Sequence, residues 1–154
     1  MELKSLVRPS GVLAELKSRS KKQLLHDLAD VAARESKIPQ RVIFEALLQR
    51  ERLGATGVGR GIAIPHCRLA DADALVVVFA RLATAIPFDS VDGEPVDLVF
   101  LIVAPELSGA DHLKALACIS RAMRDAKLVK KLRAARDKSA LLAILTDTST
   151  STAA

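Results

Sequence analysis

A histidine that directly follows a proline closes the most glycine-rich stretch of this chain. Residues 54–66 read GATGVGRGIAIPH, with four glycines in eight residues ahead of Pro65 and His66. Glycine lets a backbone turn tightly and bring its N–H groups close to a ligand, and proline biases Ile64 toward extended geometry. A neutral histidine is a nucleophile, since its ordinary pKa is about 6.5 and one ring nitrogen is free. The stretch therefore predicts an anion-binding loop beside a reactive His66.

Two familiar nucleotide-binding motifs do not fit this stretch. A P-loop, GxxxxGK[ST], needs a lysine and a hydroxyl residue where this chain has Arg60 and Gly61. A dinucleotide fingerprint needs a third glycine where this chain has Ile62. Phosphoryl chemistry on the histidine itself fits better, with Arg50 on the preceding helix as a forked donor for phosphoryl oxygens. The alternative is a turn or β-bulge in which His66 is an ordinary surface residue.

Length and composition indicate one globular domain. The chain has 154 residues, 50% of them hydrophobic and 27% charged, which is typical of a folded protein with a single core. Its apolar runs are much shorter than the roughly 18 residues of a membrane span, and its first residues contain no apolar signal segment. We expect one domain over 1–154, with its core at 3–145, a flexible tail at 146–154, a cytoplasmic location and no membrane insertion.

Charge and cysteine content exclude several functions. The formal net charge is +5, but the chain has no Trp or Tyr and only four Phe, whereas RNA and single-strand binders use aromatic stacking. Eight basic and two acidic residues lie within 121–138; a solvated helix face is favoured there over a docking surface for an acidic partner. Cys67 and Cys118 lack the spacing of a zinc or redox motif. We expect no nucleic acid, metal or cofactor. The roles of Arg60 and of the basic stretch, and any redox role of Cys67, stay open.

Periodicity predicts helices around a hydrophobic sheet. The two longest predicted strands are nearly continuous in β-branched and apolar residues, as in central strands covered on both faces. Ser20 is expected to cap one helix with Gln23 reaching back to it. Ser108 is expected to cap another, with Asp111 in its first turn and His112 one turn before Leu116 on its apolar side. The expected fold is an α/β layered domain, the sheet sandwiched by helices. Strands are expected at 12–16, 75–81 and 96–103, and helices from 20, from about 39 to 53, from 108, and at 127–136 and 139–145.

The stretch 48–66 resembles the signature of the mannitol/fructose-type enzyme IIA family of the bacterial phosphoenolpyruvate-dependent phosphotransferase system. In that family the motif reads roughly R-E-x-x-x-[ST]-[ST]-G-x-G-x-G-x-A-x-P-H, and its histidine carries the phosphoryl group. Here Arg50 opens the motif, Ala55 replaces the first hydroxyl residue and His66 closes it. The resemblance covers about residues 3–145. It implies an α/β fold with a mixed central sheet sandwiched by helices, as in mannitol-type IIA proteins, and no metal or nucleotide.

The same resemblance assigns roles to individual residues. It implies that His66 accepts the phosphoryl group on Nε2, that His112 is the second active-site histidine, and that Arg50 contacts the phosphoryl oxygens. The glycine-rich loop is expected to contribute further phosphate contacts, at Thr56, Gly57, Gly59 and Gly61.

A chain of this length without an attached IIB, IIC or carrier domain is most similar to the nitrogen-type IIA, which regulates and does not feed sugar import. The resemblance then implies a phosphocarrier that accepts a phosphoryl group on His66 from an HPr-like protein. Its regulatory targets would be potassium-transport proteins or sensor kinases. One alternative is a sugar-specific IIA that passes the phosphoryl group to a IIB domain, and another is a binding module that is never phosphorylated. Whether the chain counts as an enzyme stays open.

Overall fold

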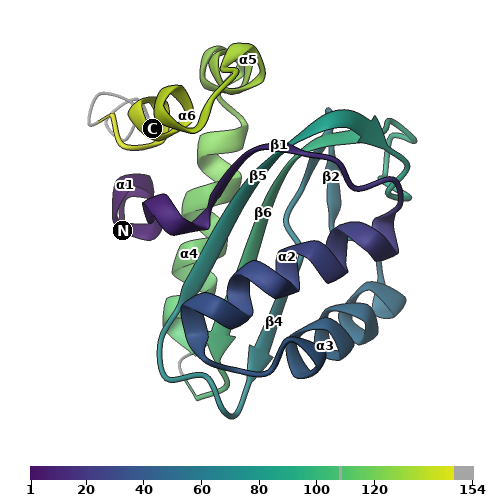
Figure 1. Cartoon of the computed structure of the whole chain (residues 1–154), viewed down its shortest axis with the longest axis vertical. Helices are drawn as coiled ribbons and strands as arrows, with labels where there is room; N and C mark the ends of the chain where they lie inside the picture. The colour runs from purple at the N-terminus through teal and green to yellow at the C-terminus, as the bar shows by residue number, and fades with distance from the viewer. Residues whose placement is uncertain (108, 148–154) are drawn as a thin grey trace.

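A six-stranded mixed sheet lies at the centre of the computed structural model, which describes residues 1–107 and 109–147 (Figure 1). In chain order the elements are α1 (Leu3–Leu6), a 3-10 turn η1 (Pro9–Gly11), β1 (Val12–Leu16), α2 (Lys21–Ser36), α3 (Gln40–Leu53), β2 (Gly57–Gly59), β3 (Ile62–Ala63), β4 (His66–Leu69), β5 (Val76–Ile86), β6 (Val96–Pro105), α4 (Gly109–Met123), α5 (Ala126–Ala134) and α6 (Lys138–Leu145).

Two long strands form the middle of the sheet. β5 and β6 are antiparallel, β1 runs parallel to β5, and both β3 and β4 run parallel to β6. Side chains of β6 alternate between the two cores: Leu98, Phe100 and Ile102 face one of them, and their neighbours face the other. Both predicted central strands are thus covered on both faces, although β5 continues to Ile86, beyond the predicted end at 81.

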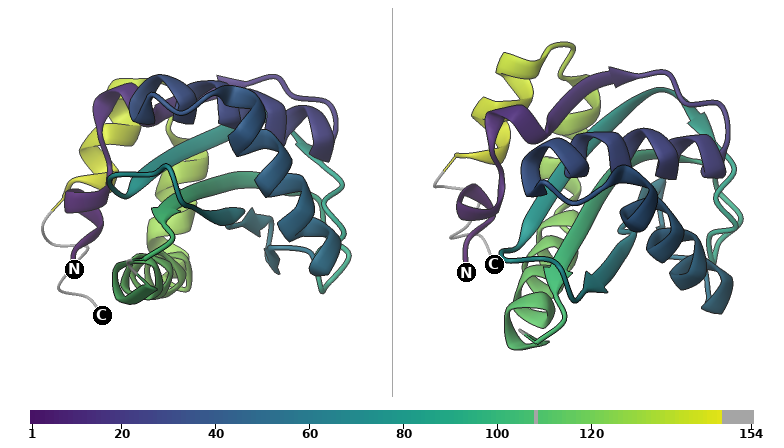
Figure 2. Two further views of the ribbon diagram at one scale, coloured as in Figure 1. Left: turned by 90° about the horizontal axis from the view of Figure 1, so that it is seen from below. Right: turned by 60° about the horizontal axis from the view of Figure 1, so that its bottom comes forward.

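Helices cover both faces of the sheet. α2 and α3 lie across one face, and α4 lies on the other together with α1, α5 and α6 (Figures 1 and 2). The expected α/β fold, with a mixed sheet sandwiched by helices, is confirmed. Ser20 caps α2 by accepting the Gln23 N–H at 3.1 Å, as predicted. The Gln23 side chain accepts from Arg19 N–H instead of from Ser20.

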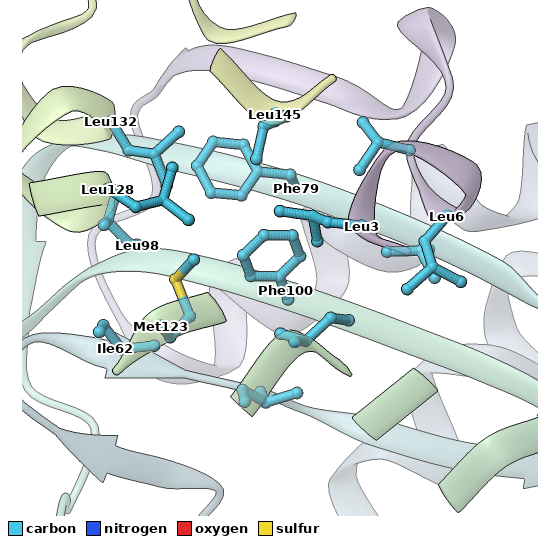
Figure 3. Packing of buried hydrophobic residues seen from close by; sticks show 14 of the residues in the cluster. Leu3, Leu6, Ile62, Phe79, Leu98, Phe100, Met123, Leu128, Leu132 and Leu145 are labelled. Carbon is cyan, nitrogen blue, oxygen red and sulfur yellow. The ribbon is translucent and has the colours of Figure 1, made fainter. Parts of the chain in front are cut away.

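The core on the α4 side is built around two phenylalanines (Figure 3). The ring centroids of Phe79 and Phe100 are 4.8 Å apart and the planes are inclined at 56°, a tilted arrangement that aromatic pairs favour. Burial of Leu3 and Leu6 holds α1, an element of four residues that is too short to show a helical period in the sequence. Other side chains of this cluster come from α4, α5 and α6: Met123, Leu128, Leu132 and Leu145.

The glycine-rich stretch is a hairpin, which corrects the expectation of a loop. β2 pairs with β3 in antiparallel fashion, and the turn between them holds Arg60 and Gly61, both at positive φ. β3 and β4 then run in one line along β6, interrupted at Ile64 and Pro65, because proline has no N–H to donate to a sheet. His66 follows this interruption directly, so the proline and the strand pairing together determine where its side chain emerges.

Gly61, in the hairpin turn, is constrained both by its backbone conformation and by its neighbours. Its φ is 79°, and a Cβ there would press on the Arg133 guanidinium and lie 3.0 Å from Asp97 Oδ1. We expect Gly61→Ala to lower the free energy of unfolding by more than about 2 kcal/mol, since left-handed geometry alone costs an alanine roughly 1–2 kcal/mol. Gly93→Ala is the matched control, because Gly93 also has positive φ (74°) but open space around it. Urea unfolding measures both, and equal losses would contradict the steric argument.

Some predictions fall outside the described residues. The Ser108 cap and the tail from 148 onward belong to this group. The two short helices after α4 are present as α5 and α6, and Asp137 caps α6 by accepting the Ala140 N–H at 2.8 Å, as predicted. Within residues 1–107 and 109–147, none of the helices combines the length and apolar character that a membrane crossing requires.

Candidate active site

His66 begins β4 and is half-buried. Its Nδ1 lies 2.8 Å from the carbonyl oxygen of Ile64. Because a carbonyl oxygen can only accept, Nδ1 carries the ring proton and donates it to this bond. Nε2 is therefore left with a free lone pair on the side of the ring away from the backbone.

His112 lies in the first turn of α4, and its ring approaches that of His66. The two ring centroids are 5.3 Å apart and the planes are inclined at 50°. His112 is buried, with 8% of its surface exposed, and its Nδ1 has no hydrogen-bond partner among the residues that the structure describes. The packing of α4 on the sheet brings together two histidines that are far apart in the sequence.

Both histidines are held in the neutral form. Burial is the largest cause that lowers the pKa of His66; the hydrogen bond to Ile64 opposes it, and the charge of Arg50 lowers the pKa further. The pKa of His112 is lowered first by burial and then by the charges of His66 and Arg68. A neutral His66 keeps its Nε2 lone pair available at neutral pH.

These lowered pKa values make the fold less stable in acid. The unfolded chain protonates its histidines near pH 6.5, whereas the folded protein protonates His66 and His112 only at lower pH. The unfolded state therefore gains protons first. We expect the free energy of unfolding to fall as the pH drops below about 6.5 and to level off below the folded-state pKa values. Urea unfolding across this range measures the effect, and the double variant His66→Asn/His112→Asn should depend less on pH. An unchanged dependence would contradict it.

Arg50 lies in the last turn of α3 and partly faces solvent. Its Nη1 donates to the Gly54 carbonyl oxygen at 2.8 Å, which ties the guanidinium to the end of the helix. From there its positive charge acts on His66. The structure therefore brings together the three side chains predicted to carry the chemistry, Arg50, His66 and His112.

Glu51 anchors the chain beside the site, a role that the sequence analysis missed. Its carboxylate is almost buried and lies 2.7 Å from Lys21 Nζ. It also accepts hydrogen bonds from the N–H and the hydroxyl of Thr56. An acidic residue in the last turn of a helix opposes the helix dipole, so its position was a signal that it needs a partner. The network holds the end of α3 against the start of the hairpin.

Arg68 is a second cation near the two histidines that was missed. It follows His66 by two residues on β4 and so lies on the same face of that strand. Its charge contributes to the lowered pKa of His112. The alternation of a strand would have identified it, but β4 has only four residues and was not predicted.

Gly59 and Gly61, expected to contact the phosphoryl group, lie at the far end of the hairpin from His66. Four residues along β6 span about 13 Å, and Gly61 lies beyond that span. The pairings that define it are Ile62 with Leu98 and His66 with Ile102. The structure therefore does not bring these two glycines to His66.

Thr56 and Gly57 lie at the other end of the hairpin. The Thr56 carbonyl oxygen accepts the N–H of Ile64, whose own carbonyl holds His66. Thr56 is 5% exposed and donates its hydroxyl to Glu51. A phosphate contact from Thr56 or Gly57 stays a prediction.

Cys67 points to the face of β4 opposite His66, into the core on the α2–α3 side. Burial raises the pKa of its thiol to about 12. A redox-sensitive cysteine needs a readily formed thiolate, so the position of Cys67 next to His66 does not make it a redox switch. The pKa of Cys118 is also raised, chiefly by burial.

The sequence of this chain is similar to those of known proteins. The profile of the family described as "Phosphoenolpyruvate-dependent sugar phosphotransferase system, EIIA 2" matches residues 5–148. A protein of Bradyrhizobium diazoefficiens named "Nitrogen regulatory protein" is 52% identical over 145 residues, which cover 94% of this chain and 95% of the relative.

Two solved structures share the fold. The nitrogen regulatory protein IIA-Ntr of Neisseria meningitidis matches with a TM-score of 0.88 and 31% identity, over 94% of this chain and 99% of that one. The mannitol IIA of Escherichia coli matches with a TM-score of 0.77 over 90% of this chain and 98% of that one; its identity of 20% makes this a likeness of fold.

Proposed function

Because this chain belongs to the EIIA type 2 family of the phosphoenolpyruvate-dependent sugar phosphotransferase system and is a phosphocarrier of the IIA type, we propose that it accepts a phosphoryl group on Nε2 of His66 from an HPr-like protein. We further propose that it regulates other proteins through its phosphorylation state. One observation carries the choice of atom: the bond from His66 Nδ1 to the Ile64 carbonyl leaves Nε2 unprotonated. The name of the Bradyrhizobium relative supports the regulatory role.

The transfer is an in-line displacement at phosphorus. The Nε2 lone pair of His66 forms the new N–P bond as the N–P bond of the donor's phosphohistidine breaks, and the donor imidazole leaves with the bonding electron pair. Because Nδ1 keeps its proton throughout, His66 needs no general base. Negative charge lies on the three equatorial oxygens in such a transfer, and catalysis consists mainly of positioning and charge stabilisation. Arg50 and His112 supply the donors for those oxygens.

The phosphorylated histidine changes the local charge. The phosphoryl oxygens carry about −1.5 to −2 charges at neutral pH, by analogy with other phosphorylated side chains. Because Nδ1 stays protonated, the ring carries about +1, so the side chain as a whole becomes negative by about half to one charge. The phosphoryl group is added where Arg50, Arg68 and His112 already gather positive or protonatable groups. The added charge favours protonation of His112 and partly neutralises the two arginines. The phosphorylated and unphosphorylated forms therefore present different electrostatic surfaces to a partner that contacts this site.

Large exposed leucines flank the site and suit a protein donor. Leu53 ends the helix that holds Arg50 and is 85% exposed, and Leu113 follows His112 and is 64% exposed. Apolar side chains exposed next to a charged site are typical of docking surfaces. They support a macromolecular donor for His66 over a small-molecule donor.

The direct test is reconstitution. The protein is incubated with phosphoenolpyruvate, enzyme I and an HPr-like carrier, and intact mass is measured. We expect one acid-labile phosphoryl group per chain, and none when the carrier is left out. A wild-type protein that stays unmodified beside a carrier that is itself phosphorylated would overturn the proposal.

A second step distinguishes the regulatory role from sugar transport. The phosphorylated protein is mixed with fructose- and mannitol-type IIB domains, and the phosphoryl group is followed. We expect it to stay on this chain, while the two forms bind potassium-transport proteins or sensor kinases with unequal affinity. Rapid transfer to a IIB domain would assign the chain to sugar uptake.

A further inference from the structure

A pocket lies at the end of the molecule away from the two histidines. It has a volume of about 230 Å³ and lies between the hairpin turn and the corner where α4 meets α5. Met123, which lines it, ends the helix whose first turn holds His112. Eleven helical residues separate the two positions, about 16 Å along the axis of α4. The pocket is therefore distinct from the phosphoryl site.

The floor of this pocket is apolar. Ile62 is fully buried, Met123 is 1% exposed and Val129 is 6% exposed. Figure 3 shows Ile62 and Met123 side by side at the edge of the core, next to Leu98 and Leu128. Ala126, which is exposed, and the edge of Val129 provide the apolar surface that a hydrocarbon group would cover, above the buried side chains of Ile62 and Met123.

The rim of the pocket is positively charged. Arg60 and Lys130 line it, and neither has a carboxylate within ion-pair distance in the part of the chain that the structure describes. The third cation, Arg133, is already neutralised by Asp97, with Nε–Oδ2 at 3.0 Å. Two cations therefore remain at the rim for an anion from outside.

Backbone conformation and three hydrogen bonds hold Arg60 in place. It has φ 57°, a left-handed conformation that is uncommon for a residue other than glycine. Its N–H donates to Asp92 Oδ2 at 2.8 Å, and its carbonyl accepts from Arg133. Its Nη2 donates to the Met123 carbonyl at 3.2 Å, which places the guanidinium across the pocket. This assigns a function to the arginine that the glycine-rich motif left unexplained.

We propose that this pocket binds a small organic anion, a carboxylate on a short aliphatic chain. The two oxygens of a carboxylate match one arginine and one lysine, and the chain would cover Ala126 and Val129. The pocket is smaller than the roughly 300–1,000 Å³ of sites for drug-sized ligands, which limits the ligand to a few carbon atoms. This site does not depend on phosphorylation of His66.

Titration with hexanoate, followed by amide NMR, tests the proposal on the unphosphorylated protein. We expect saturable shifts centred on Arg60, Ala126, Val129 and Lys130. Hexanol lacks the charge and acetate lacks the chain, so each should bind about tenfold more weakly or less, the order expected for losing one charged hydrogen bond or the apolar contact. Inorganic phosphate should shift only the cationic rim. Absence of saturable shifts with millimolar hexanoate would overturn the proposal, as would equal binding of hexanol.

Matched variants locate the site. Lys130→Gln and Arg60→Asn, in which asparagine tolerates left-handed geometry, should each weaken hexanoate binding about tenfold. Lys131→Gln removes the same charge from the neighbouring exposed residue, which does not line the pocket, and should bind hexanoate like the wild type. If Lys130→Gln and Lys131→Gln weaken binding equally, hexanoate responds to overall charge and the pocket is not its site. Unchanged amide positions far from the pocket verify that each variant is folded.

Discussion

Replacing His66 by alanine is expected to abolish phosphoryl acceptance, with a loss of at least about 10³-fold in rate, because the nucleophile itself is removed. We expect no replacement from His112, the neighbouring histidine, because it is buried and its Nδ1 is enclosed. Intact mass after incubation with phosphoenolpyruvate, enzyme I and an HPr-like carrier measures the loss.

The matched control is His26→Ala. His26 is an exposed histidine of α2 that packs edge-on against Phe44 and lies outside the site, so this variant should be phosphorylated like the wild type. In the wild type, NMR of the phosphorylated imidazole should show attachment at Nε2, with Nδ1 still bonded to Ile64. Attachment at Nδ1, or a phosphoryl group that persists on His66→Ala, would show that the proposed acceptor atom is wrong.

Arg50→Ala is expected to slow phosphoryl acceptance by about 10² to 10³, the usual cost of removing one preorganised donor to a developing charge. Arg50→Lys should fall between this variant and the wild type, since lysine keeps the charge and loses the forked geometry. Single-turnover transfer from a phosphorylated carrier, sampled by rapid quench, measures the rates.

Arg52→Ala is the control for Arg50→Ala, because Arg52 lies two residues along the same helix turn and is exposed. Its rate should stay near that of the wild type. The Arg50 charge lowers the pKa of His66, so in Arg50→Ala an NMR titration should show that pKa raised. A rate within about twofold of the wild type would remove Arg50 from the site, since it is far below the cost of a lost oxyanion donor.

The parts of the fold that could be predicted are those with a long repeat of one pattern. α2 shows its apolar stripe over about two and a half turns, and all five predicted side chains are buried: Leu24, Leu25, Leu28, Val31 and Ala32. The two central strands could be predicted because each is an unbroken run of apolar residues. By contrast, β2, β3 and β4 have two to four residues each, which is too few for a period to appear. They were therefore expected as a loop.

The candidate site, too, has one part that could be predicted from local sequence and one part that could not. The proline ahead of His66 marks a constrained histidine from local chemistry alone, whereas the partnership with His112 depends on how α4 packs on the sheet. Only resemblance to a known family could supply that contact. The same holds for Arg60, which meets α5 only because the hairpin turn reaches the far end of the sheet. Tertiary contacts of this kind leave no periodic trace in the sequence.

The hydrogen bond between His66 and Ile64 spans only three consecutive residues. The tautomer of His66, the proposed nucleophile, is consequently determined by a short peptide segment and not by the packing of distant helices. Substitutions that reshape the surrounding surface for new partners would leave that tautomer untouched. A segment with this property can be inherited unchanged while the surface around it changes, so that the chemistry of the histidine and the choice of partner can evolve separately.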